Sequence, residues 1–84
     1  MADPYGIQKH SVSIRGHRTS LSLEAVFWDA LKADAAQSDV SVAQLIATLD
    51  DARIARKDGL NLSSAIRVYL FEKALGMKDG RHAS

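Results

Sequence analysis

Between Lys9 and Leu23 the sequence alternates small polar residues with aliphatic ones, and this period of two predicts β-strands. Gly16 interrupts the alternation, so we expect strands at residues 9–15 and 18–23, joined by a two-residue turn at Gly16 and His17. A single long strand with a bulge at Gly16 would also fit. In the hairpin, Arg15 would lie opposite Arg18. One face would then carry Ser11, Ser13, Arg15, Arg18, Ser20 and Ser22, and the other Val12, Ile14, Thr19, Leu21 and Leu23.

Apolar residues then recur at spacings of three and four, which predicts helices at residues 24–37, 42–57 and 62–75. Ser22 can cap the first helix. Ser41 and Gln44 form a capping-box pattern at the start of the second, and Asn61 can cap the third. The third helix carries apolar side chains on two sides. This indicates that it is sandwiched between other elements, most economically in a dimer.

The two ends of the chain lack either periodicity. Residues 1–8 and 76–84 are therefore expected to be flexible tails around a single domain at residues 9–75. The predicted fold class is α+β, mainly α.

Composition agrees with one small soluble domain. The chain has 84 residues, a length close to the lower limit at which one hydrophobic core is self-sufficient. Hydrophobic residues make up 46% of it and charged residues 25%, as in ordinary globular proteins. It contains no cysteine, which excludes disulfides, thiolate catalysis and sulfur-ligated metals and fits a reducing, cytoplasmic environment. No apolar run approaches the ~20 residues of a membrane helix, so no membrane partner is expected.

The net charge of +1 is too small to indicate a nucleic-acid partner by itself. Its distribution is more informative. Residues 1–23 hold Lys9, Arg15 and Arg18 against a single acid, Asp3, whereas residues 24–40 are net acidic. The positive charge that could meet a phosphate thus lies on the predicted strands.

Enzymatic chemistry finds little support in the sequence. The three histidines lie on separate segments without a second ligand at metal-binding spacing, so surface imidazoles are the preferred interpretation. Asp50 and Asp51 are neighbours on a predicted helix and diverge, as on a solvated face. Trp28, within an apolar stripe, is assigned to packing. We therefore expect no enzyme activity, no metal and no cofactor.

The polar face of the predicted hairpin is the strongest candidate for function. A two-stranded ribbon is narrow enough to enter the major groove of DNA. There Arg can bind guanine with two hydrogen bonds, and Ser can bind either base edge. An ordinary solvent-facing strand is the competing interpretation.

The order of strand, helix, capped turn and helix resembles the ribbon-helix-helix family of bacterial DNA-binding proteins. The stretches S-V-S-I-R-G-H-R-T-S-L-S-L-E, F-W-D-A-L and N-L-S-S-A-I-R-V are similar to those of a short, largely uncharacterised branch of that family. The resemblance spans roughly Lys9 to Leu75. It implies an intertwined homodimer in which one strand from each chain pairs across a two-fold axis.

Residue roles follow from the resemblance by position. Base-reading side chains would be Arg18, Ser20 and Ser22. Contacts with phosphates or flanking DNA would come from Ser41, Val42, Arg15 and Lys9, the first two through the start of the second helix. The shared dimer core would comprise Leu21, Leu23, Phe27, Leu31, Leu45, Ile46 and Leu49.

Three features depart from the family pattern. The turn before the second helix carries Asp39, an unfavourable neighbour for a phosphate. The strand at residues 9–15 is additional, and four strands across a dimer could be too wide for one groove. The third helix also extends the minimal fold.

The leading hypothesis is a homodimeric, sequence-specific DNA-binding protein that acts as a transcriptional regulator, such as a repressor. The alternative is an adaptor or antitoxin-like protein whose third helix binds a partner protein through Val68, Tyr69, Phe71 and Leu75. A third possibility is a domain that dimerises but has lost DNA binding.

Overall fold

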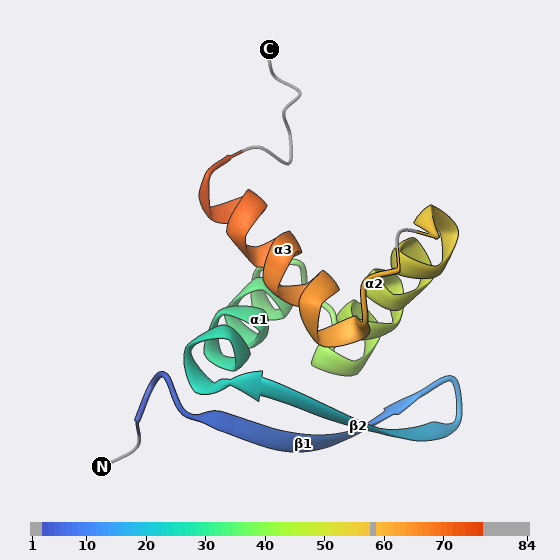
Figure 1. The fold of residues 1–84 in the computed structure, drawn as a ribbon, viewed down its shortest axis with the longest axis horizontal. Helices are drawn as coiled ribbons and strands as arrows, with labels where there is room; N and C mark the ends of the chain where they lie inside the picture. The colour runs from blue at the N-terminus through green and yellow to red at the C-terminus, as the bar shows by residue number, and fades with distance from the viewer. Residues whose placement is uncertain (1–2, 58, 77–84) are drawn as a thin grey trace.

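The computed structural model describes residues 3–57 and 59–76 of the chain. Strands β1 (Ile7–Ile14) and β2 (His17–Glu24) form an antiparallel hairpin, followed by helices α1 (Ala25–Gln37), α2 (Val42–Arg56) and α3 (Leu62–Ala74). All three helices lie on one side of the hairpin, and its other side is open (Figure 1). The expected α+β fold, with its additional N-terminal strand and third helix, is confirmed.

The N-terminal segment takes part in the fold before β1 begins. Gly6 and Pro4 accept hydrogen bonds through their carbonyl oxygens from the backbone N–H groups of Ala25 and Val26, at 2.9 and 2.8 Å. These bonds satisfy the first turn of α1, where Ser22 was expected to act and where no side chain caps the helix. Of the tails expected at residues 1–8 and 76–84, residues 7 and 8 lie within β1, and residues 1–2 and 77–84 lie outside the described residues.

The hairpin turn lies one residue earlier than the sequence pattern predicted. Its two central residues are Arg15 and Gly16, with φ of 51° and 81°, which is the pattern of a type I′ turn. Ile14 therefore pairs with His17, and Ser13 pairs with Arg18. The predicted turn at Gly16 and His17 was wrong because glycine serves here at the second central position. The pairing shifts by two residues, so each strand residue keeps its predicted face.

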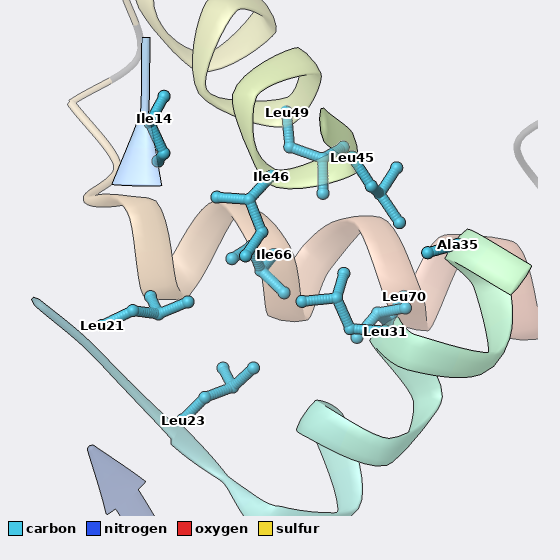
Figure 2. Packing of buried hydrophobic residues seen from close by; sticks show 10 residues of the cluster. All are labelled: Ile14, Leu21, Leu23, Leu31, Ala35, Leu45, Ile46, Leu49, Ile66 and Leu70. Atoms are coloured by element: carbon cyan, nitrogen blue, oxygen red, sulfur yellow. The ribbon is translucent and has the colours of Figure 1, made fainter. Parts of the chain in front are cut away.

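Each face of the hairpin meets a different environment. Leu21 and Leu23 of β2 point toward the helices and pack with Leu31, Ile46 and Ile66, and all five are fully buried (Figure 2). These residues come from β2, α1, α2 and α3 of one chain. A single chain therefore encloses its own hydrophobic core.

Side-chain caps that the sequence predicted define the N-terminal ends of α2 and α3. The Ser41 hydroxyl accepts a hydrogen bond from the Gln44 backbone N–H, and the Gln44 side chain accepts one from the Ser41 backbone N–H, at 3.0 and 2.9 Å. Asn61 accepts from the Ser64 backbone N–H at 2.9 Å. The predicted capping box and the Asn61 cap are thus confirmed.

Polar contacts attach α3 to α1 around a buried carboxylate. Asp34 is 6% exposed and lies 2.6 Å from Lys73 Nζ, and the Tyr69 hydroxyl donates a hydrogen bond to its other oxygen. The hydrogen bond with Asp34 raises the pKa of Lys73 above its ordinary value of 10.5. Burial, followed by the bond to Asp34, raises the pKa of Tyr69. These contacts set the position of α3 along α1.

A second set of polar contacts attaches α3 to the end of β2. Arg67 donates to Glu24 at 2.8 Å, and the Ser63 hydroxyl donates to the Ser22 carbonyl oxygen at 2.7 Å. The hydrogen bond from Arg67 lowers the pKa of Glu24 below its ordinary value of 4.5. The third helix is therefore fixed to both α1 and the hairpin.

We predict that the α1–α3 contact weakens at high pH. The pKa values of Tyr69 and Lys73 are both raised in the folded state. Their contribution to the free energy of unfolding is therefore complete below about pH 10 and is lost as the pH rises through the folded-state pKa values. Lys73→Met should lower the free energy of unfolding by about 1–3 kcal/mol at neutral pH, because it leaves Asp34 without its cation. The variant should also show a shallower loss of unfolding free energy as the pH rises in the alkaline range. Urea titrations across the alkaline range measure both effects. Lys32→Met, which removes an exposed lysine 3.7 Å from Asp29, is the matched control and should change neither.

The Glu24–Arg67 contact predicts the opposite pH dependence. A lowered pKa stabilises the fold above the ordinary value of 4.5, and this contribution disappears as the pH falls through the folded value. Glu24→Gln should therefore show a shallower loss of unfolding free energy on acidification than the wild type. Glu72→Gln, at an exposed position on the same helix as Arg67, should behave like the wild type. Parallel acid profiles for wild type and Glu24→Gln would contradict this role.

Candidate nucleic-acid interface

The open face of the hairpin combines hydroxyl and cationic side chains from both strands. In the observed register Lys9 lies opposite Ser22, Ser11 opposite Ser20, and Ser13 opposite Arg18, and all six residues are exposed. Because paired residues share a face, these six side chains form one surface, here called the ribbon face. No helix covers it (Figure 1). The structure thus brings together four of the predicted DNA-contacting residues, Lys9, Arg18, Ser20 and Ser22.

Arg18 lies across the ribbon face rather than extending freely into solvent. Its Nε donates a hydrogen bond to the Ser11 hydroxyl on β1 at 3.0 Å. Ser11 was placed on this face from the alternation, but its contact with Arg18 depends on the register and was not anticipated. The Nη atoms of Arg18 have no partner among residues 3–57 and 59–76. They remain available to donate to a ligand.

Arg15 points away from the ribbon face, toward α2. From the turn it donates to the Ala47 carbonyl oxygen at 3.3 Å and to Asp51, and its Nη1 lies 3.7 Å from Asp50. Arg53 also binds Asp50, at 2.8 Å. The acidic pair interpreted as a solvated helix face thus holds the turn against α2. A phosphate contact by Arg15 would require it to leave these acids and stays a prediction.

The N-terminus of α2 is separate from the ribbon face, which is formed by β1 and β2 alone. The Ser41 hydroxyl already accepts the capping hydrogen bond from Gln44, while the backbone N–H groups of Val42 and Ala43 have no partner among the described residues. Asp39, just before this turn, adopts a left-handed φ of 58° and is exposed. The predicted role of Ser41 and Val42 toward a phosphate stays a prediction.

The inner face of β1 carries His10, which was expected to be a surface imidazole. His10 stacks on Trp28 of α1 with ring centroids 3.8 Å apart and an interplanar angle of 9°. Its Nε2 is buried and has no hydrogen-bond partner among the described residues. The expectation of a surface imidazole was therefore wrong for His10, because β1 packs this position against α1. The assignment of Trp28 to packing is confirmed. No group of three potential metal ligands occurs within residues 3–57 and 59–76.

The outer side of α3 leaves apolar surface uncovered. Val68, Phe71 and Leu75 are 41%, 61% and 57% exposed, at spacings that place them along one side of the helix. Of the three, Val68 also lines a groove of about 390 Å³ between α2 and α3, together with Tyr69 and Leu49. None of the described helices is long and apolar enough to span a membrane.

Comparison with known proteins places this arrangement in a family. A family model described as a ribbon-helix-helix domain matches residues 7–74. An uncharacterized protein from Bordetella pertussis Tohama I has a similar structure, with a TM-score of 0.75 and 33% sequence identity over 96% of this chain. The present chain spans 66% of that protein's chain. No curated protein matches the sequence. The chain therefore belongs to the ribbon-helix-helix domain family, a family of DNA-binding regulatory proteins whose members generally form dimers.

Proposed function

We propose that this protein is a homodimeric, sequence-specific DNA-binding protein that represses transcription in the cytoplasm and reads the major groove with its ribbon face. The carrying observation is the ribbon face itself, which presents Lys9 and Arg18 among four serines and is covered by no helix. A two-stranded ribbon has the width of the major groove, and hydroxyl and guanidinium groups match the donors and acceptors displayed there.

Separate roles follow from the chemistry of each side chain. Arg18 donates through its Nη atoms to the O6 and N7 acceptors of guanine, and the hydroxyls of Ser20 and Ser22 contact neighbouring base edges. Lys9, at the far end of the face from the turn, contacts the phosphate backbone. The N-terminus of α2, at Ser41 and Val42, positions the protein on a further phosphate.

Dimerisation is proposed from the family, since related proteins bind DNA as pairs. A two-fold dimer would recognise two half-sites related by dyad symmetry. Of the seven residues proposed for the shared core, one chain already buries all but the half-buried Phe27. A shared core would therefore arise by exchange of equivalent elements between chains, as in intertwined dimers.

A second candidate function is favoured by the exposed apolar side of α3. An adaptor or antitoxin-like protein would bind its partner through Val68, Phe71 and Leu75, with Tyr69 at the edge of the adjacent groove. Such a surface can coexist with DNA binding because it lies on the helical layer, away from the ribbon face.

Replacing Arg18 tests base reading. We expect Arg18→Ala to weaken binding to the duplex that the wild-type protein enriches from a randomised pool by about 1–3 kcal/mol, with little effect on a scrambled duplex. Lys9→Ala is the contrasting variant. It should weaken binding to both duplexes alike and reduce the salt-dependence slope by about 1, since it removes a phosphate contact. Fluorescence anisotropy at several salt concentrations measures both. Equal losses on both duplexes for Arg18→Ala would contradict base reading.

Introducing a charge on α3 tests the second candidate. Phe71 is mostly exposed in a single chain, so Phe71→Glu should change the unfolding free energy by less than about 0.5 kcal/mol and leave both the dimer and DNA affinity intact. Ile54→Glu, at an exposed apolar position of α2, is the matched control. Sedimentation velocity and thermal melting provide the measurement. Dissociation to monomers in Phe71→Glu alone would assign this side of α3 to the dimer instead of to a partner protein.

A further inference from the structure

We infer that Ser11 of β1 is a positioning residue for base recognition, which acts by holding the Arg18 guanidinium through a hydrogen bond between the two strands of the hairpin. This inference rests on the proposed function. The predicted base-reading residues, Arg18, Ser20 and Ser22, all lie on β2, whereas Ser11 would be a specificity-determining residue on β1.

Strand β2 is already paired within its own chain. β1 pairs with β2 along all eight residues of each strand, from Ile7 opposite Glu24 to Ile14 opposite His17. At the other edge of β2, the Ser22 carbonyl oxygen accepts the hydrogen bond from Ser63 of α3. Hence the strand that lies beside Arg18 on the ribbon face is β1 of the same chain.

Ser11 and Arg18 contact each other diagonally between the two strands. Ser11 lies opposite Ser20 and therefore diagonally across from Arg18, within reach of a long side chain on the same face. Its hydroxyl accepts from Nε at 3.0 Å and can still rotate its own hydrogen toward solvent or a ligand. Ser13, directly opposite Arg18, has no hydrogen bond to it among the described residues. Ser11 is thus the residue that orients the guanidinium.

The hydrogen bond to Ser11 occupies Nε of Arg18 and leaves the terminal Nη atoms free. A guanidinium has five N–H donors in a planar fork, and fixing Nε directs the terminal Nη pair outward. That pair matches the two major-groove acceptors of guanine. An arginine oriented before binding loses less conformational freedom on contact, which strengthens the correct complex. Ser11 would therefore affect discrimination between sequences while leaving the charge of the ribbon face unchanged.

The test measures discrimination, as the ratio of affinities for the enriched duplex and its scrambled counterpart. Ser11→Ala should reduce this ratio by about 2- to 12-fold, the range expected for one hydrogen bond. Affinity for the scrambled duplex and the salt-dependence slope should stay unchanged because no charge is lost. Ser11→Thr keeps the hydroxyl and suits a strand, so it should restore the wild-type ratio. Gln8→Ala, at an exposed position of the same strand outside the ribbon face, is the matched control and should retain that ratio.

A double variant shows whether Ser11 acts through Arg18. If it does, Ser11→Ala combined with Arg18→Ala should have the same ratio as Arg18→Ala alone. Additive losses, or an unchanged ratio in Ser11→Ala while Arg18→Ala loses discrimination, would overturn the inference and leave the proposed function standing. Absence of wild-type binding to either duplex at low salt would overturn the proposed function itself. Circular dichroism confirms that each variant is folded before its binding is compared.

Discussion

The hairpin turn at Arg15 and Gly16 is the constraint on which the arrangement of the candidate site depends. Two consecutive positive φ values give the strands the twist and the register of a type I′ hairpin. That register places Ser11 diagonally across from Arg18 and directs Leu21 and Leu23 into the core. Arg15 attaches this turn to α2 by binding the acids Asp50 and Asp51. The orientation of the ribbon relative to the helical layer is therefore fixed at its tip as well as along its inner face.

The third helix completes the domain at both ends of α1. Asp34 is a costly group to bury, and its contacts with Tyr69 and Lys73 compensate for much of that cost. An apolar contact in place of these polar ones would be at least as stable, but it would not define the position of α3 along α1. Arg67, in the middle of α3, binds Glu24, and Ser63, near the start of α3, binds the Ser22 carbonyl oxygen, so both hold this part of the helix against β2. The polar contacts thus specify one position for α3, while the apolar residues supply most of the driving force.

The sequence was sufficient to predict the features that depend on periodicity. Alternation separated the two faces of the hairpin correctly even though the turn was misplaced, because a shift of two residues preserves the parity of every side chain. Helix starts at Ser41 and Asn61 were also predictable from local capping chemistry. Contacts between distant segments were not. Arg15 meets Asp51 across 36 positions and Tyr69 meets Asp34 across 35, and no local pattern reports such pairs.

The pairing of charges explains how a nearly neutral chain can present a cationic surface. Four acids, Glu24, Asp34, Asp50 and Asp51, lie close to cations from other elements of the fold, so these charges largely cancel within the helical layer or at its edges. Lys9 and Arg18 have no acidic partner among the described residues and face the open side of the hairpin. Net charge averages over both groups and therefore hides the segregation. In the proposed contact with DNA, a polyanion, the local electrostatic potential of the ribbon face matters more than the net charge of the chain.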